Sequence, residues 1–94
     1  MAIKVVCLGL PLVGPTHISV EPDPALGLTL RELVSRYVAP QFKGDLVQAL
    51  FDAKGLRDGF VILVNGRNAL GLGGPDSLVQ DHAQVFIMPP VDGG

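Results

Sequence analysis

The chain is poor in cysteine, in aromatic residues and in charge. Its 94 residues include one cysteine, one tyrosine, four phenylalanines and no tryptophan, and only 17% are charged. The single cysteine, Cys7, has no partner for an internal disulfide, whereas small domains of oxidising compartments usually carry several cysteines. We therefore expect a reducing, cytoplasmic location.

Basic clusters and long apolar runs are missing too. The formal net charge is −2 and no stretch groups the Lys and Arg residues. Because binding to nucleic-acid phosphates needs clustered cations, we expect no nucleic-acid partner. The apolar N-terminal run contains Lys4 and is interrupted by Gly9 and Pro11, so it is too short to span a bilayer and lacks the pattern of a secretion signal. We expect a buried strand there and no membrane partner.

The usual signatures of an active site are also absent. His17 and His82 have no second ligand at metal-binding spacing, which predicts no metal site. Cys7 lies between apolar neighbours, which favours an inert packing role because burial raises the pKa of a thiol. The glycine-rich stretch 71–74 is not followed by Lys-Ser/Thr or by a clear helix, so it is interpreted as a turn. We expect a protein that is not an enzyme and binds no cofactor itself.

What the sequence does contain is a regular series of short elements. Thr29 and Glu32 form a capping box, which predicts that a helix begins at Leu30, and Pro40 should end it. A second helix is predicted around Leu46–Phe51, with Gly55 as its C-terminal cap. Asn65-Gly66 predicts a tight hairpin turn, because both residues accept positive φ. The expected strands are Ile3–Leu8, His17–Glu21, Phe60–Val64, Arg67–Leu70 and Gln84–Met88.

This order predicts an α+β fold with a mixed sheet and one main helix packed on one face. The first and last strands are apolar on both alternating faces, so we expect them to lie side by side at the sheet centre, parallel and covered on both sides. The result is a β-grasp (ubiquitin-like) topology. We assign residues 1–88 to this domain and residues 89–94 to a flexible C-terminal tail.

The tail is the most informative segment. Pro89-Pro90 leaves the last strand in an extended conformation, and the chain ends on Gly93-Gly94, two residues without a Cβ atom. Extended, six residues reach at most ~20 Å, which is enough to enter a partner's site while the domain stays outside. A narrow channel admits such a backbone more easily than one that carries side chains.

This C-terminus resembles that of the MoaD/ThiS family of β-grasp sulfur carriers, and is closest to the small subunit of molybdopterin synthase. That pattern is a buried final strand, then Pro-Pro-Val, one small residue and Gly-Gly. Ile62–Arg67 and Thr29–Tyr37 are similar to the strand, turn and first helix of that family. The segment Pro11–Pro15 departs from it, as does Asp92, which stands where a small residue is usual.

The resemblance implies that an E1-like partner uses ATP to adenylate the Gly94 carboxylate, which sulfur then converts to a thiocarboxylate. It implies delivery to the molybdopterin synthase large subunit, so that the chain would be a non-catalytic carrier or subunit. Related carriers for thiazole, cysteine or tungsten-cofactor synthesis and a ubiquitin-like modifier share such a tail and stay open. An interaction module with an inert tail is a third alternative.

Partner docking is predicted at two places. One is the tail itself, from Pro89 to Gly94. Within it, Asp92 should weaken or redirect activation relative to a small residue, because it adds a second carboxylate near the terminal one. The other is the uncovered sheet face, because one helical layer in so small a domain covers only one face. The predicted docking residues are Pro89, Pro90, Val91, Asp92, Phe60, Ile62, Phe86 and Met88.

Overall fold

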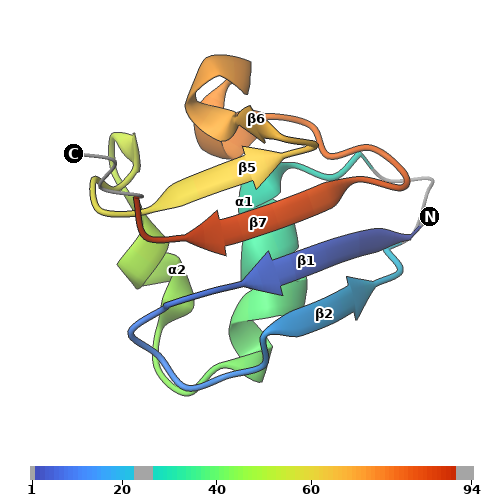
Figure 1. Ribbon diagram of the computed structural model, residues 1–94. Helices are drawn as coiled ribbons and strands as arrows, with labels where there is room; N and C mark the ends of the chain where they lie inside the picture. Colours follow the sequence, from blue (N-terminus) through green and yellow to red (C-terminus); the bar gives the residue numbers. More distant parts are fainter. Residues whose placement is uncertain (1, 23–26, 91–94) are drawn as a thin grey trace.

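The computed structural model describes residues 2–22 and 27–90. Its centre is a five-stranded sheet in the order β2-β1-β7-β5-β6 (Figure 1). The strands are β1 (Ile3–Cys7), β2 (His17–Val20), β5 (Val61–Val64), β6 (Arg67–Asn68) and β7 (Gln84–Met88). β1 and β7 run parallel at the centre, and the other neighbours are antiparallel. The predicted mixed sheet with two parallel central strands is confirmed.

One helical segment covers one face of this sheet (Figure 1). It begins as α1 (Leu30–Leu33), continues as one turn of π-helix, η1 (Val34–Val38), and ends in a 3₁₀ turn, η2 (Ala39–Gln41). The predicted capping box is present: the Thr29 hydroxyl accepts from the Glu32 N–H at 3.1 Å, and the Glu32 carboxylate accepts from the Thr29 N–H at 3.2 Å. Leu30, Leu33, Val34 and Val38 are fully buried against the sheet.

The second helix is shorter than predicted. α2 (Leu46–Leu50) is capped by the Asp45 carboxylate, which accepts from the Gln48 N–H at 3.0 Å. Gly55 is not its cap, so that prediction is wrong. The chain instead leaves α2 at Phe51 into a small hairpin of β3 (Phe51–Asp52) and β4 (Gly55–Leu56), whose strand pairing ends the helix early.

Two further turns complete the chain. Asn65 and Gly66 join β5 to β6 with φ values of 52° and 81°, as predicted for a tight hairpin. The glycine-rich stretch forms two 3₁₀ turns, η3 (Ala69–Leu72) and η4 (Gly74–Asp76), which agrees with its interpretation as a turn. In the described ranges, no helix has the length and apolarity needed to cross a lipid bilayer.

The core lies between the helical layer and one face of the sheet. Every second residue of the central strands points into it and is almost fully buried: Ile3, Val5, Cys7, Ile62, Val64, Val85 and Ile87. The residues between them face the other way and are half-buried or exposed. The expectation that the first and last strands are covered on both sides is therefore wrong, because no second helical layer covers the described part of this open face.

Candidate functional site: the open sheet face and the end of the last strand

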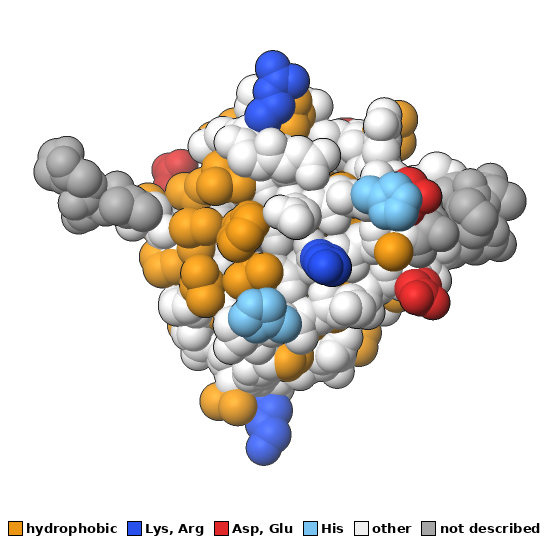
Figure 2. Space-filling model, turned by 45° about the vertical axis from the view of Figure 1, so that its right-hand side comes forward, with side chains coloured by type: hydrophobic (Ala, Val, Ile, Leu, Met, Phe, Trp, Pro, Cys, Tyr) orange, Lys and Arg blue, Asp and Glu red, His pale blue; other side chains and the backbone are white. Residues whose placement is uncertain are grey.

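The open face carries an apolar cluster at the carboxyl ends of β1 and β7. Strand register places Phe86 between Val6 on one side and Leu63 on the other, and places Met88 opposite Val61. All five side chains are half-buried, and Leu8, just beyond β1, is 44% exposed. We call Val6, Leu8, Val61, Leu63, Phe86 and Met88 the apolar half of the open face. Figure 2 shows a dense group of hydrophobic side chains on the molecular surface.

The four docking residues predicted on the sheet fall into three groups. Phe86 and Met88 belong to the apolar half, as expected from their place on the last strand. Ile62 does not: it is fully buried, and its partner across the register is Ile87, which also lies in the core. Phe60 packs against the edge of the core rather than standing on the open face. Assigning Ile62 to the exposed face is therefore wrong.

The error has a physical reason. Every residue from Phe60 to Val64 is apolar, so the sequence gives no alternation that tells one face of the strand from the other. In the fold, Val61 and Leu63 take the open side, and Val6 joins them because β1 pairs with β7. Sequence reasoning missed these three residues. A better signal was the pairing itself: once β1 and β7 are aligned, residues beside Phe86 must share its face.

The end of β7 is held by the loop that follows β1. The backbone N–H of Leu8 donates to the Ile87 carbonyl at 2.9 Å, which extends the parallel ladder by one bond. Gly9 then adopts φ +62°, and a Cβ atom placed there would lie 3.1 Å from both Cδ and Cγ of Pro89. A Cβ atom at this position would press against the Pro89 ring, which would have to shift by a few tenths of an ångström. Pro89, the first residue of the predicted tail, thus lies close to Gly9.

Pro89 and Pro90 are exposed and follow directly on the apolar half. The remaining predicted tail residues, Val91, Asp92, Gly93 and Gly94, lie outside the described residues, and β7 ends at Met88, the last residue assigned to the domain. The chain thus leaves the sheet beside its apolar surface, with four residues still to follow Pro90.

Cys7 is buried in the core, as the packing interpretation requires. Desolvation by this burial raises the pKa of the Cys7 thiol to about 11. Because the thiolate is the nucleophilic form, this thiol is almost entirely unreactive near neutral pH. His17 lies exposed on β2, and His82 is exposed in the turn before β7 with φ +63°. Among residues 2–22 and 27–90, no three His, Cys, Asp or Glu side chains gather into a potential metal site.

Comparison with known proteins identifies the family. The ThiS family matches residues 16–94, which is most of the chain. The protein belongs to the ThiS family. Its β-grasp fold is the one shared by the small sulfur carriers and ubiquitin-like proteins of that family, which are generally not enzymes. The family membership and the β-grasp fold predicted from the sequence are confirmed.

Several solved structures are similar to this ThiS-family chain over nearly its whole length. A chain of the Amycolatopsis orientalis BexX/CysO complex is 25% identical with a TM-score of 0.70, covering 99% of this chain and 100% of that one. Urm1 from Trypanosoma brucei is 24% identical (TM-score 0.69, 99% and 95% covered). SAMP1 from Haloferax volcanii is 19% identical (TM-score 0.66, 100% and 100% covered). No curated protein gives a match.

Proposed function

We propose that this protein carries sulfur as a thiocarboxylate on Gly94. The observation that carries the proposal is the exit of the chain from the sheet: β7 ends at Met88 within the apolar half, and Pro89, which lies close to Gly9, begins a segment that finishes in Gly93-Gly94. A partner that covers the apolar half would thereby lie next to the point where the chain leaves the sheet at Pro89. Membership of the ThiS family supports the same conclusion.

The chemistry needs a partner because a free carboxylate is a poor electrophile. An E1-like enzyme would transfer AMP from ATP to the Gly94 carboxylate and release pyrophosphate. The acyl adenylate is then attacked at its carbonyl carbon by sulfide, the C–S bond forms, and AMP leaves with the former carboxylate oxygen. The chain supplies the reacting carboxylate and binds no cofactor of its own, while the partner supplies the ATP site and the catalysis.

The apolar half is the docking surface in this proposal. Six hydrophobic side chains on an uncovered face of so small a domain leave apolar area in water that a partner would remove. In the solved BexX/CysO complex, a similar chain is bound to another protein. The same surface would serve in turn the activating enzyme and the sulfur acceptor, since both must reach the same chain end.

For the acceptor we propose the large subunit of molybdopterin synthase, in the cytoplasm. The support is the sequence Pro89-Pro90-Val91 before Gly93-Gly94, which resembles the small subunit of that synthase. The second candidate is a carrier for another pathway or a protein modifier, which the similarity to the CysO complex favours. Incubating the thiocarboxylate form with the large subunit and its substrate separates them: formation of the dithiolene product supports the first, and lysine conjugates or other acceptors support the second.

The test of the carrier chemistry is a mass measurement. With an E1-like enzyme of the same genome, ATP and sulfide, the protein should gain the mass difference between sulfur and oxygen, on its C-terminal peptide. Removing Gly94, or adding one alanine after it, should stop the gain while leaving the circular dichroism spectrum unchanged, because the change lies beyond the last strand. No gain on the C-terminal peptide in the presence of ATP and sulfide would contradict the proposal. A gain of one whole sulfur atom on the peptide containing Cys7, with a persulfide donor in place of sulfide, would show a thiol-based carrier instead.

A further inference from the structure

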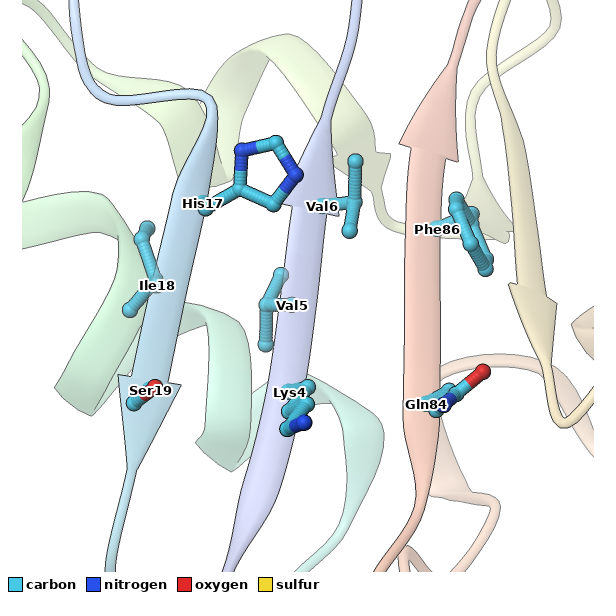
Figure 3. Close-up of a pocket in the computed structure, with 8 residues that line it drawn as sticks. All are labelled: Lys4, Val5, Val6, His17, Ile18, Ser19, Gln84 and Phe86. Carbon is cyan, nitrogen blue, oxygen red and sulfur yellow. The ribbon is translucent and has the colours of Figure 1, made fainter.

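A hollow lies on the open face beside the apolar half. Its volume is about 340 Å³, and its lining comes from β2, β1 and β7 (Figure 3). Two cross-strand rows form its walls. One row is His17, Val6 and Phe86, and the other is Ser19, Lys4 and Gln84. Between them, the backbone of Val5 and Ile18 forms the floor, because those side chains point into the core. The hollow is thus a slot with one largely apolar wall and one polar wall.

The polar wall is cationic and has no counter-ion among the described residues. Lys4 is exposed and forms no ion pair there; the ion pairs that are present join Glu32 to Arg36 and Asp81 to His82, elsewhere in the fold. The side chains of His17, Ser19 and Gln84 likewise make no hydrogen bond within the described part of the chain. Neither row contains a carboxylate, although the protein has nine acidic residues and a net charge of −2. Within the described residues, the Lys4 ammonium is therefore unpaired and can pair with a group from outside.

The two walls together define the chemistry of the occupant. An isolated inorganic anion would pair with Lys4 but would leave Val6 and Phe86 in contact with water. A glutamate or aspartate side chain from a protein that already covers the apolar half suits both walls: its methylene groups contact Val6 and Phe86, and its carboxylate faces Lys4. Val6 and Phe86 belong to both the slot and the apolar half, so one partner surface can cover the two without a break.

We propose that the slot receives an acidic side chain of the activating enzyme. The enzyme would then bind the open face at two adjoining places, the apolar half and the slot that carries Lys4. This inference rests on the proposed carrier function and adds to it the chemistry of the partner's surface. The pair of charges would set the orientation of the docked domain and so direct the chain end toward the partner's ATP site. Such charge pairs contribute more to orientation and encounter rate than to bulk affinity.

The test compares substitutions with the same change in charge at two sites. Lys4→Glu should raise the KM of the ATP-dependent Gly94 modification by about tenfold or more, with little change in kcat. Lys54→Glu, in the exposed turn between β3 and β4, is the matched control and should leave KM unchanged. Lys4→Arg keeps the charge and should behave as the wild type does. The advantage of the wild type over Lys4→Glu should shrink as salt is added.

A zero-length carbodiimide gives an independent readout, because it joins an amine to a carboxylate only where the two are in contact. In the complex it should link Lys4 to an Asp or Glu of the enzyme, and Lys4→Arg should lose this link while keeping its KM. If the wild type is modified normally but Lys4→Glu keeps its KM within twofold, or Lys4 links to nothing, the slot inference is wrong and the carrier function stands. If the wild type is never modified, both are wrong.

Discussion

On β5 and the carboxyl half of β7, the two faces of the central sheet are both apolar and yet behave differently. On β5 and β7, Ile62, Val85 and Ile87 are completely buried under α1 and η1, whereas Leu63, Phe86 and Met88, their immediate neighbours along the strands, remain half in contact with solvent. Hydrophobicity alone does not separate the two sets. What separates them is that the described part of the chain supplies one helical layer, so one set of apolar side chains stabilises the fold and the other is left for a partner.

The sharpest test of this comparison is a pair of truncations at adjacent positions. Ile62→Ala should lower the free energy of unfolding by about 2 to 5 kcal/mol, because it leaves a cavity in a packed core. Leu63→Ala should cost no more than about 1 kcal/mol, since its side chain is already partly solvated. Urea denaturation of both variants measures the difference. Equal losses would mean that the open face contributes to the fold as the core does.

A charge placed on the open face should weaken partner binding and leave the cooperative unfolding of the domain intact. Phe86→Glu should weaken binding to the activating enzyme by roughly 30-fold or more, the usual effect of losing a central aromatic anchor, while unfolding stays cooperative. Leu78→Glu is the control, since Leu78 is 66% exposed but lies outside the apolar half. Isothermal titration with each variant checks this. Similar weakening by the two substitutions would show a general effect of added charge.

Gly9 lies beside Pro89, where the chain leaves the sheet, and should be sensitive to substitution for that reason. Gly9→Ala and Gly59→Ala both place a side chain at positive φ, +62° and +98°, at a cost of about 1 to 2 kcal/mol. Only the first brings a methyl group against Pro89; nothing lies within 4 Å of a Cβ atom at Gly59. We expect Gly9→Ala alone to reduce the rate of Gly94 modification severalfold. If both variants lose stability but neither lowers the rate of Gly94 modification, the proximity of Gly9 to Pro89 has no role in that modification.

Cys7, on the core side, should give the smallest effect on function. With a thiol pKa of about 11 instead of 9.0, alkylation by iodoacetamide at pH 8 should be very slow in the native protein and rapid in urea. Since the folded pKa is raised, the thiol's contribution to stability is complete below about pH 9 and is lost as the pH rises toward 11. Cys7→Ala should remove this part of the pH dependence and leave sulfur loading unchanged. Fast alkylation of the folded protein would contradict the burial.

Much of the fold follows from local sequence signals. The capping box of Thr29 and Glu32 and the Asn65-Gly66 turn depend on interactions within a few residues. Both can therefore be predicted without knowledge of the rest of the chain. The parallel pairing of the first and last strands also follows, because both are apolar and their connection is long enough to cross over. The start of α2 is also set locally, by the Asp45 cap. Its end is not, since it depends on pairing between β3 and β4.

The sequence by itself determined the β-grasp topology, because the periodicity of its apolar residues, its helix caps and its turn residues encode it. The Gly93-Gly94 pair is likewise visible in the sequence alone. Only the tertiary structure decided which side of β5 faces the core. Phe60–Val64 is apolar throughout, and a shift of one residue would exchange its two faces, so the choice is made by the register with β7. The registers of β1 with β7 and of β2 with β1 likewise bring Val6, Lys4 and His17, which are distant from Phe86 in sequence, onto the face that carries Phe86.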